Sequence, residues 1–289
     1  MLAALTNAGA VWRLLGERNL GLIAAGVAFF AMLAIFPAVA ALIALVGFLA
    51  DPAAVDDALA VMADFLPQEA FSILSDQIDR LTGAPSQTLG FASALSLGAA
   101  TWSARLGVAA LIQGMTAIYG GAPRSGPRGI ILALFLTVLL IGVGVVAVTA
   151  MLFMPIALAL VGRFLPGDST LPFIAEVLRW AVALGALIIG LGLFYRYGPN
   201  RPKNQRSPFL SHGLFLALFL WSAASLGFSI FLTNFGNYNE IYGSIGAVIA
   251  LLMWLYISAY AVLIGAALNH VVEKNGRKAR ATAEAGQTT

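Results

Sequence analysis

Long apolar segments alternate with short polar segments along most of the chain. Six of the apolar segments are long enough to cross a hydrocarbon core of about 30 Å as helices that rise about 1.5 Å per residue. The six expected spans cover residues 20–50, 88–119, 130–161, 172–195, 208–234 and 243–270. None of them has the alternating pattern of a barrel strand, so the pattern predicts transmembrane helices.

Residues 51–86 form the only long hydrophilic stretch between these spans. Asp51 and Pro52 are suited to the start of a helix, and Pro67 ends that helix and begins another. Apolar residues recur at helical spacing in both halves, with acidic residues opposite them. We therefore expect an extracytoplasmic amphipathic helical hairpin, which lies on the outer membrane surface, covers the bundle as a lid, or forms a packed cap without a ligand.

Composition identifies the class of protein. The 289 residues are 60% hydrophobic and only 10% charged, and their mean hydropathy is +0.91. Such a chain has too little polar surface for a soluble globule of this size. We expect an all-α fold, a polytopic membrane helix bundle, with a single membrane domain over residues 1–272 and a flexible cytoplasmic tail over residues 273–289.

Basic residues gather in four clusters, and all four fall on one side of the membrane if the six spans alternate in direction. The clusters are Arg13 and Arg18; Arg124 and Arg128; Arg196, Arg201, Lys203 and Arg206; and Lys274, Arg277, Lys278 and Arg280. Because Lys and Arg are enriched in cytoplasmic loops, the pattern predicts a protein of the bacterial inner membrane with both termini in the cytoplasm. Membrane lipids are the expected partners, and the basic loops are suited to attracting anionic headgroups.

The side chains argue against enzymatic chemistry. The chain has no Cys, and His212 and His270 lie on different segments without the spacing of metal ligands. No acidic residue lies deeper in an expected span than Glu176, so neither a carboxylate metal cluster nor a buried proton carrier is expected. We expect no catalysis, no metal, no cofactor and no nucleic-acid partner, although the isoelectric point is near 9.4.

Polar residues inside the spans indicate a candidate substrate pathway. Arg105 lies within the second span, where a central charge costs at least about 2.5 kcal/mol on insertion scales, so we expect it to face the bundle. Serines of the fifth span recur on one helical face, and asparagines follow it. The candidate pathway comprises Trp102, Ser103, Arg105, Ser222, Ser225, Ser229, Asn234, Asn237, Tyr238, Tyr242 and Gly243.

Two functions from different classes fit these features. The first is a transporter or flippase of a lipid-like or anionic amphipathic envelope component. The second is a non-transporting membrane scaffold or envelope-assembly protein, in which small residues only pack helices and Arg105 is an anchor that snorkels to the membrane surface. A water-filled cavity around Arg105 favours the first function, and a dry bundle favours the second.

Three motifs carry a resemblance to a known family. Near the C-terminus, Tyr242-Gly243-Ser244 and Gly246 precede Trp254, Gly265 and Asn269. The second span contains Trp102-Ser103, Arg105, Gly107 and Tyr119-Gly120, and a third motif is Tyr195-Arg196-Tyr197-Gly198-Pro199-Asn200. These motifs resemble those of the YihY/BrkB family of bacterial inner-membrane proteins, once misnamed ribonuclease BN.

The resemblance implies a role in moving lipid or envelope components. It also implies a Tyr-Gly-Ser turn before the last helix and a cytoplasmic interface at the third motif. Aromatic and basic anchors are expected there at Tyr195, Arg196, Tyr197, Pro199 and Asn200. The chain departs from the family pattern at three places: Leu106 separates the expected Arg-Gly pair, Thr116 stands where Asn is expected, and Ala267 stands where Glu is expected.

Overall fold

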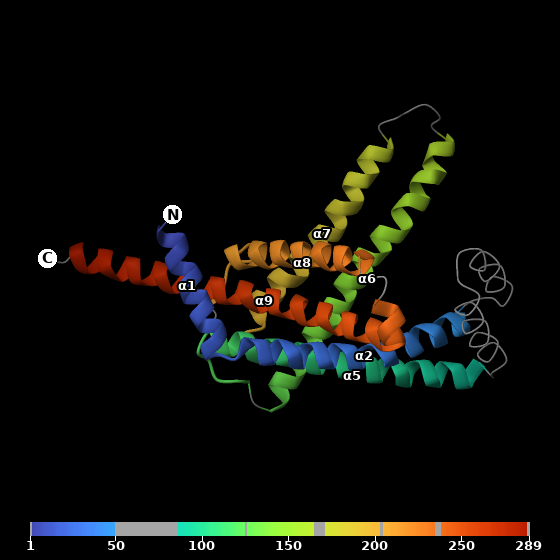
Figure 1. Cartoon of the computed structure of the whole chain (residues 1–289), viewed down its shortest axis with the longest axis horizontal. Coiled ribbons are helices and arrows are strands. Elements are labelled where there is room, and N and C mark those ends of the chain that lie inside the picture. Colours follow the sequence, from blue (N-terminus) through green and yellow to red (C-terminus); the bar gives the residue numbers. More distant parts are fainter. Residues whose placement is uncertain are drawn as a thin grey trace. The chain divides into compact units, whose positions relative to one another are not determined.

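A computed structural model describes residues 2–49, 86–124, 126–164, 171–202, 205–234 and 238–287. Within them the chain is helical and forms no strand, which confirms the all-helical class (Figure 1). The helices are α1 (Leu2–Glu17), α2 (Leu20–Leu49), α5 (Ser86–Ile118), α6 (Pro127–Phe164), α7 (Leu171–Tyr197), α8 (His212–Asn234) and α9 (Tyr238–Gln287). Apart from its last residue, the hairpin expected over residues 51–86 lies outside the described residues.

Helix length and composition support a polytopic membrane protein. Five described segments are long and apolar enough to cross a membrane: Ala94–Ile118, Pro127–Ala147, Glu176–Tyr197, His212–Phe231 and Val248–Ala279. A sixth span results if Thr6–Glu17 and Leu20–Ile35, which are bent by 64° at the break between them, cross together. Five of the predicted spans therefore coincide with α5 to α9, and the span predicted over residues 20–50 coincides with α2, which counts as a span among the described residues only together with α1.

The chain forms two compact units, residues 1–29 with 105–289, and residues 30–104. In the smaller unit, the described residues are the C-terminal part of α2 and the N-terminal part of α5. In the larger unit, α6 packs against α7, α8 packs against α9, and α1 packs against α9. Large apolar side chains such as Phe135 and Phe219 are exposed on this unit, as expected where lipid replaces water.

Two glycines bring α8 and α9 into backbone contact. A Cβ atom on Gly213 would collide with the carbonyl oxygen of Gly265, and a Cβ atom on Gly265 would collide with that of Gly213 and with the Tyr195 hydroxyl. Only residues without side chains allow helices to approach so closely. The contact fixes the N-terminal end of α8 against the second half of α9.

Asn269 of α9 caps the first turn of α8. Its Oδ1 accepts a hydrogen bond from the Gly213 N–H at 2.7 Å, and its Nδ2 donates to Ser211 Oγ at 2.8 Å. Ser211 Oγ also accepts from the Leu214 N–H at 3.3 Å. The free N–H groups of Gly213 and Leu214 are thus satisfied by Asn269 and Ser211. α8 therefore begins at His212, four residues after the start predicted at residue 208.

The end of α9 corrects a second prediction. The helix continues to Gln287, whereas a flexible tail was expected from residue 273. The segment is rich in Ala, Glu, Lys and Arg, which favour helix. Helix α1, which the sequence pattern does not predict, packs on α9, and Asn275 Nδ2 donates to Asn7 Oδ1 at 2.9 Å.

The start of α9 corrects a third prediction. The helix begins at Tyr238, so Tyr242–Ser244 lie inside its first turns and not in a preceding turn. A glycine inside a helix lowers helix stability by about 1 kcal/mol relative to alanine. This cost does not end α9, because the residues that follow Gly243 favour helix. Among the described glycines, positive φ angles occur at Gly120 and Gly126, between α5 and α6.

We expect Gly265→Ala to lower the melting temperature of the purified, detergent-solubilised protein. The added methyl group would force α8 and α9 apart, and overpacking of this kind costs about 1–3 kcal/mol. Gly227→Ala is the matched control, because a Cβ atom at Gly227 of α8 has no neighbour within 4 Å. Equal melting temperatures for the two variants would contradict the close crossing.

Candidate functional site

A buried ion pair joins the α7–α8 connection to α9. Arg201 Nη2 donates to Glu273 Oε2 at 2.5 Å, and Ser207 Oγ donates to Glu273 Oε1 at 2.6 Å. The Arg201 side chain is only 6% exposed, and that of Glu273 is 22% exposed. Arg201, Ser207, Glu273 and the neighbouring Tyr119 are called the junction cluster below.

Tyr119 links the junction cluster to the end of α5. Its ring lies under the Arg201 guanidinium at 4.0 Å, and its hydroxyl lies 3.3 Å from Ser207 Oγ. Because Ser207 gives its proton to Glu273, Tyr119 is the donor in this contact. Burial raises the pKa of the Tyr119 phenol to about 12, although the hydrogen bond with Ser207 opposes this shift. The phenol therefore remains neutral and able to donate at physiological pH.

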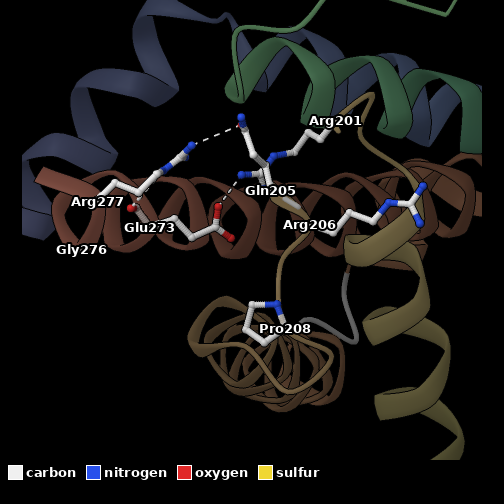
Figure 2. A pocket seen from close by; sticks show the side chains of 7 residues that line it. All are labelled: Arg201, Gln205, Arg206, Pro208, Glu273, Gly276 and Arg277. Atoms are coloured by element: carbon white, nitrogen blue, oxygen red, sulfur yellow. Dashed lines mark hydrogen bonds and ion pairs between the residues drawn. The ribbon is translucent and has the colours of Figure 1, made fainter. Parts of the chain in front are cut away.

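A cavity of about 270 Å³ lies beside the junction cluster and is called the junction cavity (Figure 2). Its lining residues include three arginines and one glutamate: Arg201, Arg206 and Arg277, with Glu273. Arg277 Nη1 donates to the side-chain oxygen of Gln205 at 3.2 Å. The Arg206 guanidinium extends away from Glu273 and lies over the Tyr197 ring at 5.1 Å. The net charge of the lining is therefore positive.

A second cavity, of about 290 Å³, is lined by α5, the α5–α6 connection and α6, and is called the Arg105 cavity. Arg105 is 8% exposed and lies near the middle of the apolar segment Ala94–Ile118. As the sequence predicts, the side chain is enclosed by protein and does not face lipid. Gln113 and Thr116 of α5 add polar groups to the lining, and Ile130 and Ala133 of α6 form part of its apolar wall.

Arg124, which also lines the Arg105 cavity, serves as a cap for the end of α7. Its Nη1 donates to the Gly198 carbonyl at 2.6 Å, and its Nη2 donates to the carbonyls of Pro199 and Tyr197 at 3.1 and 3.4 Å. A cation at a helix C-terminus satisfies free carbonyls and complements the helix dipole. Arg124, one of the lining residues of the Arg105 cavity, is thus bound to the α7 carbonyls.

A third cavity is apolar and lies within the span region of the larger unit. Its volume is about 230 Å³, and its lining includes Leu111, Leu140, Val143 and Trp221. Leu140 and Ala133, which lines the Arg105 cavity, are seven residues apart on α6 and therefore share one helical face. Leu136 and Thr137, both buried, lie between them. The polar and apolar cavities thus follow one another along the same face of α6.

Among the predicted pathway residues, Arg105 is the one that lines the junction cavity, the Arg105 cavity or the apolar cavity as far as the described residues show. Ser222 and Ser229 are exposed on α8, while Ser225 accepts a hydrogen bond from Trp254 Nε1 at 3.2 Å. The serine face is therefore directed outward and toward α9. In the smaller unit, Trp102 is 55% exposed and Ser103 is half-buried.

The remaining predicted pathway residues lie where α8 ends and α9 begins. Asn234 is the last residue of α8, and Tyr238, Tyr242 and Gly243 lie in the first turns of α9. Asn237 falls outside the described residues. The assignment of these residues to a substrate pathway stays a prediction.

The predicted aromatic and basic interface is only partly surface-exposed. Tyr195 is 1% exposed, and its hydroxyl donates to the Val262 carbonyl of α9 at 2.7 Å. Tyr195 is therefore a core residue and its assignment to an aromatic belt is wrong, because its position on α7 faces α9. Arg196 and Arg206 both lie near the Tyr197 ring, at 6.0 and 5.1 Å.

The loop after α7 is held by α5 and by the α5–α6 connection. Pro199 is buried, and the Asn200 N–H donates to Thr116 Oγ1 at 3.3 Å. Asn200 Nδ2 donates to the Ala122 carbonyl at 2.9 Å. Thr116, which occupies the place of an expected family Asn, is thus a structural link to this loop.

Sequence reasoning missed the junction cluster. Tyr119, Arg201 and Glu273 lie on three segments far apart in the chain, and the basic clusters around them suggested membrane topology alone. Glu273 carried the usable signal, since it stands directly before the basic residues of the last cluster. Within the described residues, no group of three His, Asp or Glu side chains is arranged to hold a metal ion.

Comparison with known proteins identifies relatives of the chain. The family model described as "Virulence factor BrkB" matches residues 11–288. A ribonuclease-like protein, YfkH, of Bacillus subtilis (strain 168) is 28% identical over 258 residues, which are 86% of this chain and 89% of that protein. A UPF0761 membrane protein of Pseudoalteromonas atlantica is 33% identical over 102 residues, which are 35% of this chain and 30% of that protein. No solved structure matches the chain.

We expect Glu273→Gln to destabilise the protein strongly, because it leaves the Arg201 guanidinium buried without its counter-charge. Breaking a buried pair in this way costs about 3–5 kcal/mol. The matched control is Glu17→Gln, which breaks the exposed Arg13–Glu17 pair of α1 and should cost at most about 1 kcal/mol. Thermal unfolding of the two purified variants measures the difference, and equal losses would contradict the structural role of the junction cluster.

Proposed function

The chain belongs to the BrkB family of bacterial membrane proteins, and on this premise we propose that it moves an anionic, lipid-like envelope component across the membrane. The observation that carries the proposal is the Arg105 guanidinium, which is buried in an apolar span beside a cavity of about 290 Å³. An intramembrane cation is costly and typically marks a functional site. The proposal assigns no catalytic reaction to the chain.

Arg105 supplies the chemistry for holding an anionic headgroup. Its planar fork of N–H donors matches the oxygen geometry of phosphate and carboxylate groups, which a point charge does not. Gln113 adds a side-chain amide to the same lining. A small anionic headgroup is therefore the class of ligand that this cavity suits.

The apolar cavity supplies the complementary environment for a hydrocarbon chain. It follows the Arg105 cavity along one face of α6, and its lining is almost wholly aliphatic and aromatic. The adjacent polar and apolar environments match an amphipathic molecule better than a small polar solute. Leu136, buried between the two cavities, would have to shift for such a molecule to occupy both.

We further propose that the protein lies in the bacterial inner membrane with both termini in the cytoplasm. The proposal rests on the four basic clusters, because Lys and Arg accumulate on the cytoplasmic side. Arg124 of the α5–α6 connection lines the Arg105 cavity, so this orientation assigns the cavity to the cytoplasmic half of the bundle. Impermeant reagents added to one face of the membrane test this orientation.

A non-transporting scaffold is the alternative, and the serines of α8 favour it. Ser222 and Ser229 are exposed on α8, and neither lines the junction cavity, the Arg105 cavity or the apolar cavity. Intramembrane serines often form hydrogen bonds across helix interfaces. A scaffold requires no movement of lipid, so a translocation measurement separates the two functions.

Translocation of a labelled anionic lipid tests the proposal. The full-length protein is reconstituted into vesicles that contain fluorescent phosphatidylglycerol, and dithionite then bleaches the dye in the outer leaflet. We expect the protein to make inner-leaflet dye accessible, and we expect Arg105→Lys to slow this exchange by about tenfold because the bidentate contact is lost.

Arg128→Lys is the matched control, because Arg128 is exposed in the first turn of α6 and is absent from the lining of the Arg105 cavity. It should translocate lipid like the native protein. Vesicles in which the native protein is inserted yet exchanges no lipid would favour the scaffold. Equal exchange by native protein and Arg105→Lys would remove Arg105 from the mechanism.

A further inference from the structure

We propose that the junction cavity is a second anion site, which binds a phosphate group at the end of the bundle independently of the Arg105 cavity. The junction cavity is formed by the α7–α8 connection and α9, whereas the Arg105 cavity is formed by α5, α6 and the connection between them. The lining residues of the two cavities do not overlap.

Within the described part of the chain, carboxylates do not balance the positive charges around the junction cavity. Glu273 supplies its only carboxylate, and both carboxylate oxygens are already engaged by Arg201 and Ser207. Arg206 and Arg277 form no ion pair with any carboxylate of the described residues. Arg277 contacts only neutral acceptors there, the Gln205 side chain and the Glu273 carbonyl. Two arginines of the lining, Arg206 and Arg277, therefore carry positive charge that no carboxylate of the described residues pairs with.

The cavity has the size and the donors that a phosphate group needs. Its volume of about 270 Å³ greatly exceeds the roughly 10–15 Å³ that one water molecule occupies by a comparable measure. Guanidinium groups recognise phosphate oxygens through paired, charge-assisted hydrogen bonds. The side-chain amide of Gln205, another lining residue, provides a further N–H donor.

The position of the cavity favours phosphate over an acidic peptide. Pro208 lies four residues before the first residue of α8, and Gly276 and Arg277 lie at the end of the apolar segment Val248–Ala279. The cavity is thus placed where the spans end, and the exposed apolar side chain of Leu210 follows Pro208. The phosphate groups of lipids lie at this level of a bilayer. A phosphate ester in a lipid headgroup and free phosphate share this chemistry.

Binding to the full-length protein in detergent tests the site. Dioleoyl phosphatidic acid is one probe, and inorganic phosphate at matched ionic strength is the other; each raises the melting temperature if it binds the folded protein. We expect saturable stabilisation, and we expect Arg277→Gln to weaken it by about tenfold because a charge-assisted contact is lost. Stabilisation by the lipid alone identifies a headgroup site, and competition by inorganic phosphate identifies a site for free phosphate.

The matched control is Lys278→Gln, which removes one positive charge from the adjacent exposed position of α9 without altering the cavity lining. It should bind within about twofold of the native protein, because it removes only a screened surface charge. Equal weakening by the two substitutions, or stabilisation by neither probe, would overturn the proposal. Arg105→Gln should keep this binding, so failure of the junction site and failure of lipid translocation are separate outcomes.

Discussion

The cost of removing a guanidinium group from water governs the arrangement of the described helices. Three arginines are partly or wholly removed from water. Arg105 lines a cavity, Arg124 donates to the carbonyls at the end of α7, and Arg201 pairs with the carboxylate of Glu273. Lipid offers none of these partners. The cationic side chains therefore lie at helix ends and between helices, while large apolar side chains cover the outside.

The α8–α9 crossing connects these charges to the helix framework. Gly213 and Gly265 allow the two backbones to touch, and Asn269 ties the first turn of α8 to α9. One turn further along α9, Glu273 holds Ser207 and Arg201 of the preceding connection. A single face of α9 thus orders the α7–α8 connection, and with it the positive lining of the junction cavity. The same face of α9 therefore contributes both to the stability of the fold and to the candidate binding site.

The spans could be predicted from the sequence, because the length of an apolar segment decides whether it can cross a bilayer as a helix. It was weaker at helix ends: the side chains of Ser211 and Asn269 place the start of α8, and Asn269 comes from a distant segment. It also missed the junction cluster, whose members approach only after folding. Burial of Arg105 was predictable because its cost depends on depth, whereas the outward direction of Ser222 and Ser229 depends on the rotation of α8, which its near-uniform hydrophobicity leaves undetermined.

The central claim is that Arg105 borders a cavity that water and anions reach from the cytoplasmic side. The chain has no Cys, so a single introduced thiol is unique. Ala109→Cys lies in the cavity lining one turn from Arg105, and Phe135→Cys lies on the exposed face of α6. An impermeant anionic thiosulfonate reagent should modify the first thiol from the cytoplasmic face alone and leave the second unmodified. Protection of Ala109→Cys from both faces would contradict the account and leave Arg105 in a dry bundle.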